Sequence, residues 1–145
     1  MILKKFSYTE YIDTPRYWEL EEFELGEVNL IVGNNTSGKS RTLNVILGLS
    51  KSLTSPVINY NSGKYSACFL KQQDYIKYTV EFKHGSVFHE SMELNEKTLF
   101  NRNEEGSGKI WNENLQLEHD FKVPHNQLLA SRRDEIQYPY LEDLY

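Results

Sequence analysis

Eight consecutive residues at positions 33–40, Gly-Asn-Asn-Thr-Ser-Gly-Lys-Ser, constrain the fold of this chain more than any other stretch. They place Gly33, Gly38, Lys39 and Ser40 in the spacing of a phosphate-binding P-loop (Walker A motif). A short apolar run of β-branched character, 28–32, precedes them, and apolar residues at helical spacing follow them. A strand, a glycine-rich turn and a helix in this order predict an α/β fold in which a buried parallel strand leads into the loop.

The chemistry of the motif follows from its geometry. Glycines allow backbone N–H groups to surround a phosphate at close range, and the next helix adds the positive end of its dipole. The ammonium of Lys39 would lie between the outer phosphates, and the hydroxyl of Ser40 would bind Mg²⁺. The sequence therefore predicts a Mg-ATP site formed by Gly33, Asn34, Asn35, Thr36, Ser37, Gly38, Lys39, Ser40 and Arg41.

The Ser-Gly-Lys triplet alone carries little information. It recurs at Ser62 and Ser107, where no glycine lies five residues before the lysine and no apolar helix follows. We expect turns at both places.

Hydrophobic periodicity predicts the rest of the chain. The helix should extend from about 39 to 52 and fade by Ser55-Pro56, after which the period changes from 3.6 to 2. Alternating runs at 65–69, 76–82 and 88–94 are separated by turns, and a further turn at 104–108 has strands on both sides. This pattern indicates an antiparallel meander with one solvated face.

A change of parity marks the strand before the loop. Trp18 and Leu20 alternate with one phase, and Phe23 and Leu25 follow the other, which predicts a bulge near Glu21-Glu22. Within one domain of 145 residues, the expected parts are 1–55 with the P-loop, 60–123 with the antiparallel sheet and 124–145 as a connection.

Composition excludes several classes of function. A formal net charge of −5 argues against stand-alone nucleic-acid binding, which depends on neutralising phosphates. The single cysteine, Cys68, excludes an internal disulfide or a thiolate zinc cluster and reads as a buried thiol. No signal peptide and no apolar run near membrane-spanning length is present, so we expect a cytoplasmic protein with no membrane association.

Residues 18–40, from Trp18-Glu-Leu-Glu-Glu-Phe to the Gly-Lys-Ser of the loop, resemble the N-terminal lobe of ABC/SMC-type ATPases. They look most like the bacterial AAA-labelled ATPases of the OLD and recombination-repair kind. The resemblance rests on a strand pair before the loop, Asn35 at its third position and a β-subdomain after the helix. It is specific over 1–50 and architectural over 65–123. Thr36 departs from it, because these loops often have glycine there.

The resemblance implies an α/β P-loop NTPase of ABC-ATPase type, here its N-terminal lobe with an antiparallel β-subdomain. In that family, ATP is held between two heads, and a second lobe supplies a signature motif, a Walker B run ending in Asp-Glu and a switch histidine. This chain has no such run, since charged and polar residues precede Asp134-Glu135. We therefore expect a missing C-terminal lobe or partner chain, an ATP-dependent homodimer of heads, and nucleic acid reached only through the full protein.

The resemblance also suggests roles for residues outside the loop, although no catalytic residue is assigned with certainty. Gln127, rather than Gln137, is the candidate for the glutamine between lobes, with a surface residue as the alternative. An aromatic residue could stack on adenine, although Trp18 also fits a core position; the candidates are Tyr11, Tyr17 and Trp18. Arg132 and Arg133 could contact phosphate or a partner, with a pair of solvated surface residues as the alternative. A metal role is not expected for His84 or His89.

Rival functions are weaker. A small GTPase would need Asp-x-x-Gly and Asn-Lys-x-Asp, which this sequence lacks, and a nucleoside kinase would need an arginine-rich lid. Two interpretations stay open. The first is the ATP-binding domain of an ATPase that hydrolyses ATP only when completed by a second lobe. The second is a non-catalytic nucleotide-binding module whose P-loop gates assembly. Nothing in the sequence chooses between DNA repair, chromosome maintenance and anti-phage defence.

Overall fold

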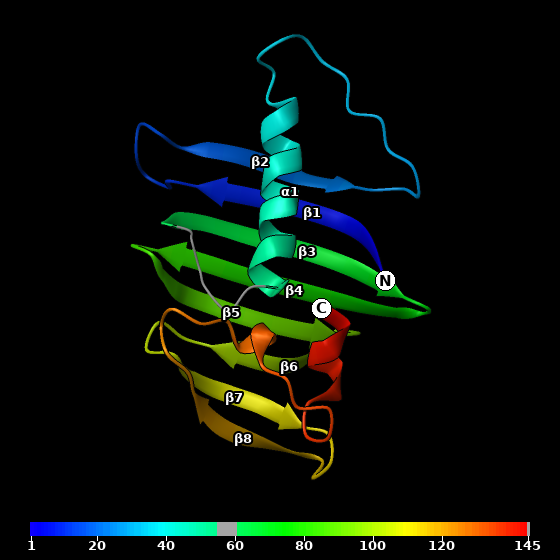
Figure 1. Cartoon of the computed structure of the whole chain (residues 1–145), viewed down its shortest axis with the longest axis vertical. Coiled ribbons are helices and arrows are strands. Elements are labelled where there is room, and N and C mark those ends of the chain that lie inside the picture. The colour runs from blue at the N-terminus through cyan, green and yellow to red at the C-terminus, as the bar shows by residue number, and fades with distance from the viewer. Residues whose placement is uncertain (55–60, 145) are drawn as a thin grey trace.

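The computed structural model describes residues 1–54 and 61–144, which are shown in Figure 1. Its strands are β1 (Ile2–Glu10), β2 (Trp18–Glu24), β3 (Ser62–Lys71), β4 (Asp74–Lys83), β5 (Ser86–Leu94), β6 (Lys97–Arg102), β7 (Ser107–Asn112) and β8 (Leu117–Lys122). Its helices are α1 (Lys39–Thr54) and two 3₁₀ helices, η1 (Leu129–Ser131) and η2 (Pro139–Leu144).

Within the described residues, the strands form one eight-stranded sheet in the order β2-β1-β3-β4-β5-β6-β7-β8. Every neighbouring pair is antiparallel, and the strands from β3 onward follow one another as hairpins. The turns expected between the alternating runs and near 104–108 are present, with positive φ at Gln72, Gly85 and Gly106. The predicted meander is therefore confirmed. The turns expected at the two other Ser-Gly-Lys triplets are wrong, because Ser62 begins β3 and Ser107 begins β7.

Helix α1 crosses one face of the sheet, from the β2 side toward β5, and η1 and η2 lie on the same face farther along (Figure 1). Leu49 and Leu53 of α1 are buried against this face, together with Leu129 and Leu141 of the two 3₁₀ helices. The core residues of the sheet below include Phe6, Tyr8, Tyr65, Ala67, Ile76, Tyr78, Val80, Phe82, Met92, Phe100 and Ile110. The predicted helix is confirmed, and its expected end at Ser55-Pro56 lies outside the described residues.

The opposite face of the sheet carries small polar side chains. Ser7, Ser66, Thr79 and Ser91 are register neighbours on successive strands, and each is half-buried. This is the solvated face that the alternation predicts. Cys68 belongs to the same face and is half-buried, so the expectation of a fully buried thiol is wrong; partial burial raises its thiol pKa.

Two of the register irregularities in the sheet change which side chains reach the core. Tyr8 pairs with Leu20 and Phe6 pairs with Phe23, so the predicted bulge at residues 21–22 is confirmed. A second one lies in β5, where Glu81 pairs with His89 and Phe82 with Val87. Val87 is therefore buried while Phe88 is displaced from the core, and the alternation expected to begin at residue 88 begins only after this irregularity.

The predicted fold class is wrong. The described chain is an antiparallel sheet with one α-helix, not an α/β P-loop NTPase fold. The parallel strand expected at 28–32 is absent, and its side chains face solvent: Val28 is 93%, Leu30 86% and Val32 76% exposed. A parallel strand needs a parallel neighbour for its backbone hydrogen bonds, and the strands of the described chain pair only antiparallel. The apolar run alone could not reveal that this neighbour is missing.

None of the helices in the described part of the chain combines the length and apolar character that crossing a bilayer requires.

Candidate functional site

The glycine-rich loop leads directly into the N-terminus of α1. The helix begins at Lys39, so residues 33–38 immediately precede its first turn. The backbone N–H groups of that turn have no intrahelical partner. The loop turns through a hydrogen bond from the Ser37 amide to the Asn34 carbonyl at 3.2 Å, and Gly38 has φ of 91°. A tight turn that ends at exposed helix amides is a geometry suited to an anion.

Two positions show why the loop sequence matters. A Cβ atom at Gly33 would lie 2.6 Å from the Ser37 hydroxyl oxygen, so a larger residue there would require the Ser37 side chain to move. Thr36 has φ of 68°, in the left-handed region that β-branched residues rarely adopt. The position at which this loop departs from the resembled family is thus one whose backbone favours glycine.

The side chain of Lys39 folds back across the loop. Its Nζ donates to the carbonyl oxygens of Gly33 at 2.7 Å and Asn34 at 2.6 Å, and lies 3.5 Å from the Ser37 hydroxyl. The ammonium therefore already sits at the mouth of the loop, where a phosphate oxygen could replace a carbonyl as its acceptor. Ser40, the proposed Mg²⁺ ligand, is exposed in the first turn of α1.

Arg41 extends from the same turn toward the edge of the sheet. Its guanidinium binds Glu10, the last residue of β1, and lies 4.1 Å from the ring centroid of Trp18, the first residue of β2. The other Glu10 carboxylate oxygen accepts a hydrogen bond from the Tyr8 hydroxyl at 2.8 Å. The Tyr8 ring centroid lies 5.8 Å from that of Trp18. We call Tyr8, Glu10, Trp18 and Arg41 the Arg41 cluster.

The cluster changes the interpretation of the three aromatic candidates. Trp18 packs against the core, which is the alternative expected for it, and the Arg41 guanidinium lies over its ring. Tyr17 is 49% exposed, and its hydroxyl donates to Glu19, which raises its pKa. Tyr11 lines a cavity of about 330 Å³ that also borders Glu10.

Gln127 lies far from the loop. The Gln127 carbonyl accepts a hydrogen bond from Arg102 on β6, whereas the start of α1 is held at β1 and β2. Four interstrand steps separate β1 from β6, which corresponds to roughly 19 Å at the usual strand spacing. The Gln127 side chain is exposed, so within this chain it is not placed to sense a phosphate on the loop.

The remaining candidates belong to turns or to residues 123–144, the segment after β8 that we call the tail. Asp134 accepts backbone N–H groups of Ile136 and Gln137 in a local turn, and Gln137 is held beside β7 through Glu113 and Asn112. The other candidates have partners within the chain: Arg132 lies over the Tyr138 ring, Arg133 pairs with Glu142, and His89 bonds Asn101. No group of three or more potential metal ligands occurs among residues 1–54 and 61–144.

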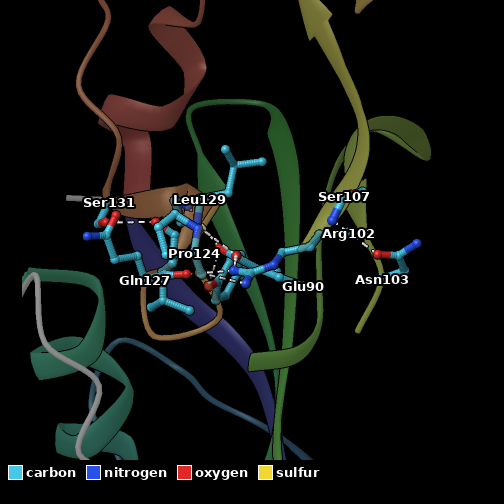
Figure 2. A network of polar contacts seen from close by, with 11 residues as sticks. Glu90, Arg102, Asn103, Ser107, Pro124, Gln127, Leu129 and Ser131 are labelled. Atoms are coloured by element: carbon cyan, nitrogen blue, oxygen red, sulfur yellow. Dashed lines mark hydrogen bonds and ion pairs between the residues drawn. The ribbon is translucent and has the colours of Figure 1, made fainter. Parts of the chain in front are cut away.

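A buried ion pair is the feature that the sequence did not identify. Glu90 on β5 and Arg102 on β6 have no exposed side-chain surface, and Arg102 Nη1 lies 3.4 Å from Glu90 Oε2. Figure 2 shows the tail wrapped around this pair. Glu90 accepts the amides of Leu129 and Ala130 at 2.8 and 2.9 Å, and Arg102 donates to the carbonyls of Pro124 and Gln127 at 2.9 and 2.6 Å.

Burial dominates the electrostatics of this pair. Desolvation raises the pKa of Glu90 and of its hydrogen-bond partner Tyr78, and lowers the pKa of Arg102. Perturbed groups often mark functional sites, but here both Glu90 oxygens accept tail amides and both Arg102 Nη atoms donate to tail carbonyls. The Tyr78 hydroxyl donates to Glu90. We interpret the pair as a clamp for residues 124–130. A glutamate at a core-facing position of an alternating strand is the one sequence signal that could have revealed it.

A scan against models of known protein families and a search of curated protein sequences gave no significant match, so no comparison assigns this chain to a family.

Proposed function

We propose that this chain binds the triphosphate of Mg-ATP at residues 33–40 and hydrolyses it only together with a second lobe or partner chain. The observation that carries the proposal is the loop at the start of α1, with the Lys39 ammonium held at its mouth by the carbonyls of Gly33 and Asn34. The loop thus combines the N-terminus of a helix with a positive charge, and both attract a phosphate group.

A requirement for a partner is supported by the exposed apolar surface beside the loop. Val28, Leu30 and Val32 face solvent, as do Leu43 and Leu47 on the outer side of α1, which are 57% and 50% exposed. Apolar side chains gathered on the two segments that flank a binding loop are typical of an interaction surface. A partner strand along 28–32 would satisfy its backbone and cover these side chains.

The position of the carboxylates supports incomplete catalysis by the chain alone. Asp134 and Glu135 belong to the segment held beside β7, five interstrand steps and roughly 24 Å from β1. Glu10 lies near the loop but is bound to Arg41 and Tyr8. Hydrolysis needs a group that positions the attacking water, and we assign that group to the partner.

Calorimetric titration with Mg-ATP tests the proposal. We expect Lys39→Ala to lower ATP affinity by about a hundredfold, or roughly 3 kcal/mol, because charge-assisted hydrogen bonds to phosphate are lost. Ser40→Ala should weaken the Mg²⁺-dependent part of binding more than the Mg²⁺-free part. Phosphate release by the wild-type chain alone should be negligible in the same samples.

Lys51→Ala is the matched control, since Lys51 is exposed in the last turn of the same helix. It should bind Mg-ATP as the wild type does. A wild-type chain that does not bind Mg-ATP, or a Lys39→Ala variant with unchanged affinity, would refute the proposal. Rapid Lys39-dependent hydrolysis by the chain alone would contradict the need for a partner.

A further inference from the structure

The Arg41 cluster contains a planar cation next to the phosphate loop, held in place from two sides. Lys39 and Arg41 are two residues apart in α1, so their side chains leave the helix about 200° apart. Lys39 therefore points across the loop while Arg41 points toward β1 and β2. The two cations of this turn therefore have different surroundings: Lys39 lies at the phosphate loop, and Arg41 lies beside aromatic rings.

The guanidinium is held by an ion pair and by an aromatic ring. Glu10, whose side chain is only 15% exposed, pairs with Arg41, and its second oxygen is occupied by the Tyr8 hydroxyl. Trp18 lies under the guanidinium at 4.1 Å from its ring centroid. An arginine stacked in this way loses little further freedom when a second flat group is added to its outer face.

The Arg41 side chain is 46% exposed, so it remains open to a ligand despite these contacts. We propose that the Arg41 guanidinium is the surface on which the base of the bound nucleotide stacks, with Trp18 and Glu10 as the positioning residues that hold it in place. This inference rests on the proposed triphosphate site, because the loop fixes the end of the nucleotide from which the base must reach Arg41. Trp18 then supports the base through Arg41 rather than by direct contact.

A neighbouring cavity offers the base a competing position. It measures about 330 Å³, borders Glu10 on the side of Tyr11 and Asn61, and falls at the small end of the range of ligand pockets. The stacking site is favoured because it presents a flat, charged surface to a flat ring, an arrangement in which Arg binds aromatic rings strongly. Binding in the cavity would not depend on Arg41.

The test compares two probes, Mg-ATP and Mg-tripolyphosphate, which share the phosphates and differ in the nucleoside. With the full chain, we expect Arg41→Ala to lower Mg-ATP affinity about tenfold and to leave Mg-tripolyphosphate affinity unchanged. Arg41→Lys keeps the charge but not the plane, so it should lose nearly as much. Lys39→Ala should weaken both probes. Lys97→Ala removes a similar cation–ring contact, 3.5 Å from the Trp111 ring centroid, between β6 and β7 near the other end of the sheet. It should change the affinity for neither probe.

Each result separates the two proposals. Equal loss for both probes in Arg41→Ala would make Arg41 a phosphate ligand and overturn the stacking site while leaving the triphosphate site intact. Unchanged affinity for both would overturn it as well and favour the cavity. Failure of the wild type to bind either probe would reject the triphosphate site and the stacking site together. Circular dichroism and thermal unfolding of each variant exclude misfolding, and Arg41→Lys provides the second variant should Arg41→Ala not fold.

Discussion

Two regions of the molecule differ in whether their apolar side chains are buried and their backbone is paired. One is the sheet with its covering helices, and the other is the segment 28–32 before α1. On the sheet, side chains such as Ile76, Tyr78 and Met92 are fully buried, and the strands pair along their length. In the segment 28–32, the apolar side chains face solvent and the backbone belongs to no strand. The segment 28–32 is apolar at every position except Asn29, so hydrophobicity alone does not explain why it stays exposed.

The comparison shows that burial depends on available neighbours. Every strand except the edge strands β2 and β8 has a strand on both sides, and the tail adds η1 and η2 to the core. The segment 28–32 lies between the sheet edge at β2 and the phosphate loop, and in the described chain no strand pairs with it. Mutations in a region that is buried within the chain should lower the free energy of unfolding of the isolated chain. Mutations in a surface that only a partner covers should leave it almost unchanged.

The largest effect is expected from breaking the buried clamp. Arg102→Leu should lower the free energy of unfolding by about 3–5 kcal/mol, because Glu90 would remain buried without its cation and two tail carbonyls would lose their donor. Urea denaturation followed by circular dichroism measures this. Lys109→Ala, which removes an exposed pair with Glu118 at 3.8 Å, should change the free energy by less than about 1 kcal/mol. Similar values for the two variants would show that the clamp does not hold the tail.

The same substitution in the two regions sharpens the comparison directly. Leu141→Ala, at a fully buried position of η2, should cost about 2–5 kcal/mol of unfolding free energy. Leu30→Ala, at a position 86% exposed, should change it by less than about 0.5 kcal/mol. A cost above about 1 kcal/mol for Leu30→Ala would mean that this segment is already covered in solution. If that cost depended on protein concentration, a second copy of the chain would be the cover.

The smallest effect concerns the backbone of the loop. Thr36→Gly should raise the free energy of unfolding by about 0.5–1 kcal/mol, because glycine removes the penalty of a left-handed β-branched residue, less its own greater freedom in the unfolded chain. Differential scanning calorimetry would detect this as a higher Tm. The control is Asn35→Gly, at the neighbouring position outside the left-handed region, which should not stabilise the chain. A lower Tm for Thr36→Gly would show that the threonine side chain, which bonds the Asn35 carbonyl, outweighs the strain.

Much of the local structure could be predicted from periodicity. The helix from residue 39, the hairpins between 62 and 122 and the bulge at Glu21-Glu22 each depend on side chains a few residues apart. The bulge in β5 was not predictable, because Val87 and Phe88 are both apolar and either could face the core. The loop motif is also local, which is why its residues could be named before their geometry was known.

The sequence by itself determined the helix from residue 39, the antiparallel meander after it and a lysine next to a glycine-rich loop, because these depend on neighbouring residues. Tertiary structure alone decided that 28–32 stays exposed, that Gln127 lies roughly 19 Å from β1, and that Glu90 meets Arg102. It also brought Arg41 over Trp18 beside the loop. Each of these outcomes depends on which strands lie side by side, and a pattern of residues along one strand carries no information about its neighbours.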